Sequence, residues 1–96
     1  MTMNNLSTTI TTGGTAQSLS AAKGGSIRKG WSVYNSSAGD LYVSDVGTAS
    51  VSDGLSYKVG PGAMLAINPQ DSNSVSQGAI SIVGATTGQT FVAREW

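Results

Sequence analysis

Residues 27–46 read IRKGWSVYNSSAGDLYVSDV. Successive side chains of a β-strand point to opposite faces, so within Ile27–Asn35 the side chains of Trp31 and Val33 share one face. The Asn, Ser, Gly and Asp residues that follow are typical of a turn. Leu41–Val46 then alternates in the same way. The stretch predicts two antiparallel strands, paired as a hairpin, each with one apolar face.

Similar short runs flank this stretch on both sides, and glycine or proline separates most of them. We expect strands at Ser7–Thr12, Thr15–Ala21, Leu55–Val59, Ala63–Asn68, Gly78–Val83 and Thr90–Trp96. Gly13-Gly14 predicts a hairpin turn between the first two strands. At the end of the second strand, one helical turn near Ser20–Lys23 is an alternative. Seven to eight short strands at this spacing predict an all-β fold. It would be a single small antiparallel β-sandwich, jelly-roll or immunoglobulin-like, or a partly closed barrel.

The length of 96 residues fits one domain with a thin core. We expect residues 1–6 to form a flexible N-terminal arm and residues 7–96 to form the β-sandwich. The first residues lack the basic and apolar regions of a signal peptide, and no apolar run is long enough to span a membrane.

Composition removes several classes of function. The chain has no cysteine and no histidine, so disulfides and thiolate or imidazole metal sites are excluded. Five basic and five acidic residues give zero net charge. A neutral surface attracts neither nucleic acid nor an anionic membrane, and we expect neither as a partner. Weak charge repulsion also suits a protein that assembles.

No catalytic constellation is evident. A serine nucleophile would need a lysine or carboxylate as its base, and no motif provides one. The acidic residues fall mostly in turns, where Asp commonly bonds its own backbone. We therefore expect no enzyme, no metal and no cofactor. The basic cluster of Lys23, Arg28 and Lys29 lies beside Trp31, and we interpret it as a solvated strand end or a contact with an acidic partner.

The aromatic residues divide into three groups. We expect Trp31, Tyr57 and Phe91 to fill the core. Tyr34 and Tyr42 would pair across the hairpin or, alternatively, form a platform that stacks on sugar rings. Trp96 either docks on its own sandwich or anchors a neighbour. The candidate partner-interface residues are Asn4, Asn5, Leu6, Tyr34, Tyr42 and Trp96.

Three segments resemble a known family. They are TITTGGTAQSL from Thr9, YNSSAGDLYV from Tyr34 with the following Gly47-Thr48-Ala49, and GAISIVGATTGQTFVAREW from Gly78. Together they resemble small structural proteins of tailed bacteriophages, over most of Ser7–Trp96. The resemblance implies a β-sandwich virion component without catalytic residues, and it carries over no particular binding residue.

The expected function is a capsid decoration, or cement, protein that binds the major capsid protein and stabilises the head. The expected assembly is a homo-oligomer, with a trimer favoured and a dimer as the alternative. The N-terminal arm would add a strand to a capsid subunit. The alternatives are a neck, tail or fibre component, or a carbohydrate-binding module used in host attachment. The expected location is the virion, after synthesis in the host cytoplasm.

Overall fold

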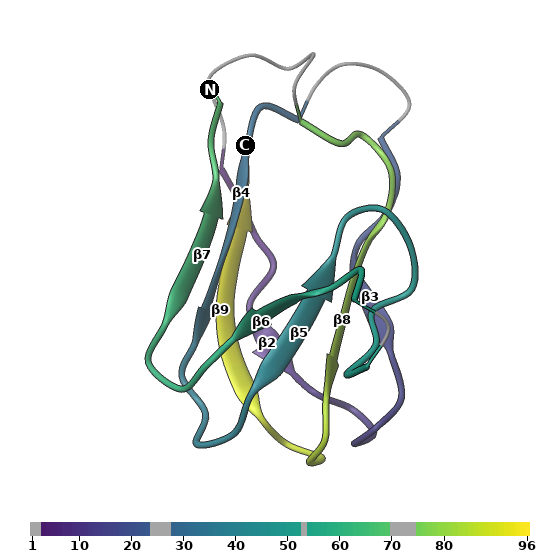
Figure 1. The fold of residues 1–96 in the computed structure, drawn as a ribbon. Coiled ribbons are helices and arrows are strands. Elements are labelled where there is room, and N and C mark those ends of the chain that lie inside the picture. Colours follow the sequence, from purple (N-terminus) through teal and green to yellow (C-terminus); the bar gives the residue numbers. More distant parts are fainter. Residues whose placement is uncertain (1–2, 24–27, 53, 70–74) are drawn as a thin grey trace.

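A computed structural model describes residues 3–23, 28–52, 54–69 and 75–96. These residues form strands and connections without a helix, which confirms the all-β prediction (Figure 1). The helical turn considered near Ser20–Lys23 is not formed. The strands are β1 (Asn4–Asn5), β2 (Thr8–Thr9), β3 (Gln17–Ser20), β4 (Trp31–Asn35), β5 (Leu41–Ser44), β6 (Tyr57–Val59), β7 (Met64–Ile67), β8 (Ile80–Gly84) and β9 (Thr90–Glu95).

The strands form two antiparallel sheets. Sheet A has the order β1-β9-β4-β7, with β2 beside β9, and sheet B has the order β3-β8-β5-β6. The pairs β2–β9, β3–β8, β4–β7 and β5–β6 are nested around the connection between β5 and β6. The chain is therefore one long antiparallel hairpin rolled into two layers. This is jelly-roll topology, which decides between the sandwich alternatives.

The predicted pairing of the strands around residues 36–40 is wrong. β4 lies in sheet A and β5 in sheet B, so the connection between them crosses from one layer to the other. The predicted hairpin at Gly13-Gly14 is wrong for the same reason, because β2 and β3 lie in different sheets. Alternation orients the apolar side chains toward the interior in both arrangements, and it does not say which sheet a strand joins.

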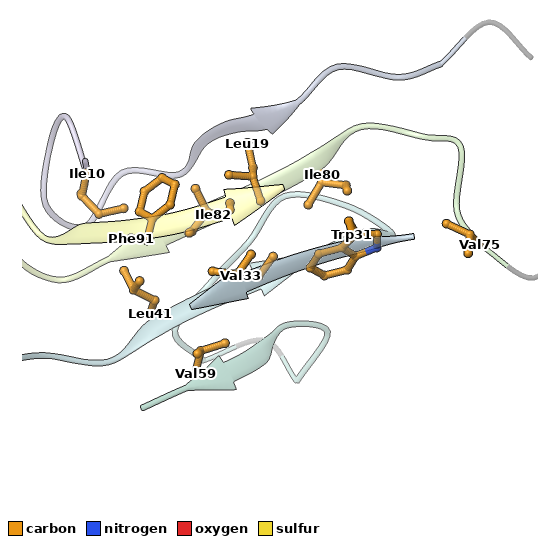
Figure 2. Packing of buried hydrophobic residues seen from close by; sticks show 12 residues of the cluster. Ile10, Leu19, Trp31, Val33, Leu41, Val59, Val75, Ile80, Ile82 and Phe91 are labelled. Atoms are coloured by element: carbon orange, nitrogen blue, oxygen red, sulfur yellow. The ribbon is translucent and has the colours of Figure 1, made fainter. Parts of the chain in front are cut away.

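The core lies between the sheets, and both layers contribute to it (Figure 2). Trp31 and Val33 of β4 and Phe91 of β9 are buried, as predicted. The indole nitrogen of Trp31 has no hydrogen-bond partner among the described residues. The other buried members of the cluster are Ile10, Leu19, Leu41, Val43, Val59, Val75, Ile80, Ile82 and Ala93.

The prediction that Tyr57 fills the core is wrong. Tyr57 begins β6, one of the two outer strands of sheet B, and 47% of its surface is exposed. Leu55, just before β6, is also exposed. Alternation gives Tyr57 and Val59 the same face, but only Val59 is buried. Solvent reaches Tyr57 because the edge of a sheet is covered on fewer sides than its centre.

The predicted N-terminal arm is a docked strand from Asn4 onward. Asn4 and Asn5 pair with Glu95 and Arg94 of β9, and Leu6 packs against the core. β2 continues along β9 in the same register. Residues 1–2 lie outside the described residues. The segment can pair with β9 because no other described strand occupies the side of β9 that faces away from β4.

Candidate functional site

The outer face of sheet A carries a row of exposed apolar side chains. Tyr34 of β4 lies opposite Met64 of β7 on one side and opposite Val92 of β9 on the other. The exposed fractions are 39% for Tyr34, 63% for Met64 and 36% for Val92. Directly opposite residues of antiparallel strands point to the same face, so these three form one contiguous strip. We call Val92, Tyr34 and Met64 the apolar row.

A second row lies beside the first on the same face. It contains Arg94 of β9, Ser32 of β4 and Ala66 of β7, which are opposite one another in the register. Arg94 and Ala66 are exposed, whereas Ser32 is buried. The outer face of sheet A is thus apolar near β7, and the cationic residue Arg94 lies on the β9 side.

The outer face of sheet B is covered by the connection between β5 and β6. The backbone N–H of Ala49 donates to Ser81 Oγ at 3.0 Å, and the N–H of Ser50 donates to Ser56 Oγ at 3.0 Å. Ala49 and Ser44 are buried although both belong to this side of the molecule. Ser81 of sheet B therefore holds a loop of the protein's own chain, and sheet A presents the barer face.

The predicted interface residues of the N-terminal segment lie at the β9 edge of sheet A. Asn4 and Asn5 are exposed, and Asn4 Nδ2 donates to Glu95 Oε2 at 3.3 Å. Leu6 is half-buried against the core. These residues are joined to the protein's own β9, so offering a strand to another subunit would require them to leave it.

Tyr34 and Tyr42 are not neighbours. Tyr34 lies on the outer face of sheet A, whereas Tyr42 lies on sheet B opposite Lys58 and Val83 and is half-buried. The predicted pairing across a hairpin is therefore wrong, because β4 and β5 do not pair. The two rings also cannot form one flat platform for a sugar.

Trp96 packs on its own sandwich. Its N–H donates to the carbonyl of Gly30 at 3.0 Å, and its carbonyl accepts from the N–H of Lys29 and of Gly30. A Cβ on Gly30 would lie 2.7 Å from Cζ2 of the indole, so only glycine leaves room for the ring. Trp96 remains half-buried. Of its two predicted roles, the structure shows the docked one.

Of the predicted basic cluster, Lys23 and Arg28 form an ion cluster with Glu95, whereas Lys29 is exposed, as a solvated strand end would be. Arg28 is 1% exposed, and its Nε lies 3.1 Å from Glu95 Oε1, which also accepts from Ser20 Oγ at 2.8 Å. Lys23 Nζ lies 2.7 Å from Glu95 Oε2. The guanidinium also donates to the carbonyls of Ala21, Ser76 and Gly78. Every group has a structural partner here, so we assign the cluster to stability.

Burial raises the pKa of Glu95, but hydrogen bonds from Lys23, Ser20, Arg28 and Asn4 outweigh burial and lower the pKa from 4.5 to about 2. Hydrogen bonds to the ionised form have this effect. A carboxylate that stays ionised to such low pH is not a general acid at neutral pH. No sequence pattern indicates that Glu95 and Arg28 meet, because they are far apart in the chain.

A groove of about 550 Å³ lies beside β3 and β8. Asp45 is the ionisable residue in its lining, together with Ser18, Ser81 and small residues of both strands. One carboxylate without a base or a second carboxylate matches no catalytic arrangement.

The described residues contain no group of three or more side chains suited to hold a metal ion. Within the same ranges, no helix has the length and apolarity needed to cross a membrane. Comparisons with protein-family models, with curated proteins and with solved structures give no match to this chain. The bare face of sheet A is therefore the candidate functional surface.

Proposed function

We propose that this protein is a structural component of a tailed-bacteriophage particle, namely a capsid decoration protein that binds the major capsid protein and stabilises the head. The observation that carries the proposal is the bare outer face of sheet A with its apolar row. Exposed aromatic and apolar side chains on a rigid sheet are typical of a protein–protein contact. The resemblance of Ser7–Trp96 to small phage structural proteins suggests which partner to test.

The distribution of charge supports a binding role over catalysis. The buried ionisable residues Arg28 and Glu95 serve the fold, and the exposed pair Lys58–Asp40 is separated by 3.5 Å at the edge of sheet B. A decoration protein makes many identical weak contacts on a capsid lattice, and their combined effect resists expansion of the head. A small neutral sandwich needs one adhesive face for this purpose.

The test is co-sedimentation of the purified protein with empty heads of the phage that encodes it. We expect near-stoichiometric binding that Tyr34→Ala weakens by about tenfold, because an aromatic anchor at the centre of an interface commonly contributes this much. Tyr42→Ala is the matched control, since it removes the same side chain from the opposite sheet.

The other outcomes assign the protein elsewhere. Binding to isolated tails or necks, with no binding to heads, would replace the decoration role by another virion position. Binding to a glycan panel without binding to any phage part would reject the proposal in favour of sugar recognition. Equal weakening by the two tyrosine variants would show that the apolar row is not the contact.

A further inference from the structure

The outer strands of the two sheets differ in how they are protected. Among the described residues these edges are β1/β2 and β7 in sheet A, and β3 and β6 in sheet B. Folded proteins block exposed edges with charges, bulges, prolines or short strands, because a free edge pairs with other chains. β6 has Lys58 at its centre, and β3 has a register shift between Ser18 and Ser20. Between β1 and β2 the pairing is interrupted, and Ser7 Oγ accepts from the N–H of Ala93.

β7 has no charged residue, no proline and no register shift, although with four residues it is as short as β3. Its residues, Met64-Leu65-Ala66-Ile67, are all apolar, and they pair with Trp31–Tyr34 without a register shift. On one side β7 pairs with β4, and on the other side no strand pairs with it in the described part of the chain. Within the described part of the chain, β7 is therefore the least protected edge strand.

The hydrogen-bonding direction of each β7 residue follows from the ladder with β4. The N–H of Asn35 donates to the carbonyl of Ala63 at 3.0 Å, so along the same ladder Leu65 and Ile67 direct their backbone groups toward β4. In an antiparallel ladder, the backbone groups of the residues between them are directed away from the partner strand. Met64 and Ala66 thus present their N–H and C=O groups to the open side.

We propose that β7 pairs antiparallel with β7 of a second copy of this chain, with the twofold axis at Leu65. Met64 of each copy then pairs with Ala66 of the other, which satisfies the outward backbone groups of both strands. Antiparallel pairing of identical strands is isologous, so one surface serves both partners. The inference does not depend on the proposed function.

Charge and side-chain packing favour a second copy as the occupant. β7 has no charged residue and the chain has zero net charge, so two identical edges approach without repulsion. Leu65 of one copy lies opposite Leu65 of the other, on the face that already packs against the core. Both side chains are half-buried in the single molecule and gain further apolar contact.

The pairing joins the two A sheets into one continuous sheet. The apolar row of each copy then meets Ala66 of the other copy, so the dimer displays a longer apolar surface than either subunit. The twofold axis gives a dimer rather than the trimer expected from the sequence. Because the strand is short, the interface is small, and we expect a concentration-dependent dimer rather than an obligate one.

The first test measures the dimer dissociation constant by sedimentation equilibrium over about 1 μM to 1 mM. Ala66→Pro removes an N–H that points to the open side and leaves the ladder with β4 intact. By symmetry two hydrogen bonds are lost, each corresponding to about a tenfold change, so we expect weakening of about a hundredfold. Thr9→Pro is the matched control, because Leu6 and Ile10 donate to β9 and Thr9 therefore points away from it.

The second test uses cross-linking in a chain that has no cysteine. Across a non-hydrogen-bonded pair the Cα atoms are about 4.5 Å apart, within reach of a disulfide. We expect Leu65→Cys to form a disulfide-linked dimer in mild oxidant. Ile67→Cys is the control and stays unlinked, because each Ile67 lies opposite Ala63 of the other copy.

Three results would overturn the inference. They are a protein that is monomeric throughout the concentration range, a dimer that Ala66→Pro and Thr9→Pro weaken equally, and a disulfide that forms at position 67 in preference to 65. Circular dichroism melting of each variant separates loss of pairing from loss of folding.

Discussion

The two ends of the sandwich are closed by different chemistry. At the end where the C-terminus lies, Arg28, Lys23 and Glu95 form an ion cluster (Figure 1). At the opposite end, the amides of Asn35 and Gln89 hold the loops. Asn35 Nδ2 donates to the carbonyls of Gly39 and Val59 at 2.7 and 2.8 Å, and Gln89 Nε2 donates to that of Asp40 at 3.1 Å.

Both clusters satisfy loop carbonyls with buried side-chain donors, which buried backbone groups require. They differ in what happens when conditions change. A neutral amide keeps its hydrogen bonds at any pH, whereas the ion cluster depends on the charge of Glu95. We therefore expect one end of this protein to be sensitive to acid and the other not, and mutation and pH test that difference.

The largest effect is expected from Arg28→Met. The variant leaves Glu95 without one of its buried cationic partners and leaves the carbonyls of Ser76 and Gly78 without their donor. Breaking a buried ion pair typically lowers the free energy of unfolding by about 3–5 kcal/mol. Urea denaturation measures the loss. Arg94→Met, on the exposed face of β9, is the control and should change stability by less than about 0.5 kcal/mol. Similar losses in both variants would refute a structural role for the cluster.

The pH dependence is the next largest effect. The pKa of Glu95 is lowered to about 2 in the folded state, so its contribution is fully present above its ordinary pKa of 4.5 and is lost as pH falls toward 2. The shift corresponds to about 3 kcal/mol. Denaturation curves between pH 6 and pH 2 should show this decline, and Glu95→Gln should flatten it. A decline of the same size in Glu95→Gln would assign it to other carboxylates.

The smallest of the three effects is expected from Asn35→Ala at the amide end. The carbonyls of Gly39 and Val59 lose a buried donor, which lowers the free energy of unfolding by about 2 kcal/mol. Unlike the stability that depends on the charge of Glu95, the stability lost in Asn35→Ala should be the same at pH 6 and at pH 3. Ser36→Ala, at the exposed neighbouring residue, is the control. If the loss grows in acid, the contrast between the two ends is wrong.

Residue alternation predicted much of the core but little of the pairing. Trp31, Val33 and Phe91 are buried on the faces that their spacing indicated, and the fold is the predicted sandwich. The hairpins failed because an apolar face points inward whether the next strand joins the same sheet or the opposite one. The prediction that Tyr57 is buried was wrong because the alternation around it matches a core strand, whereas its exposure depends on its position at the edge of the sheet.

The candidate surface was only partly accessible to sequence reasoning. Tyr34 was identified, but Met64 and Val92 were not, because the apolar row exists only when β9, β4 and β7 lie side by side. In Met64–Ile67 both faces are apolar, so alternation could not tell the outer face from the inner one.

The amino-acid sequence is sufficient to predict the all-β fold class of this protein. Short alternating runs separated by glycine-rich turns specify β-strands with one buried face, and the lack of cysteine and histidine removes disulfides and metal sites with thiolate or imidazole ligands. Only the tertiary structure decided which strands pair, that Arg28 meets Glu95, and that β7 is the least protected edge strand in the described part of the chain. The physical reason is range: alternation and turn propensity act between neighbours in the chain, whereas pairing, burial and ion contacts act between residues that only the folded chain brings together.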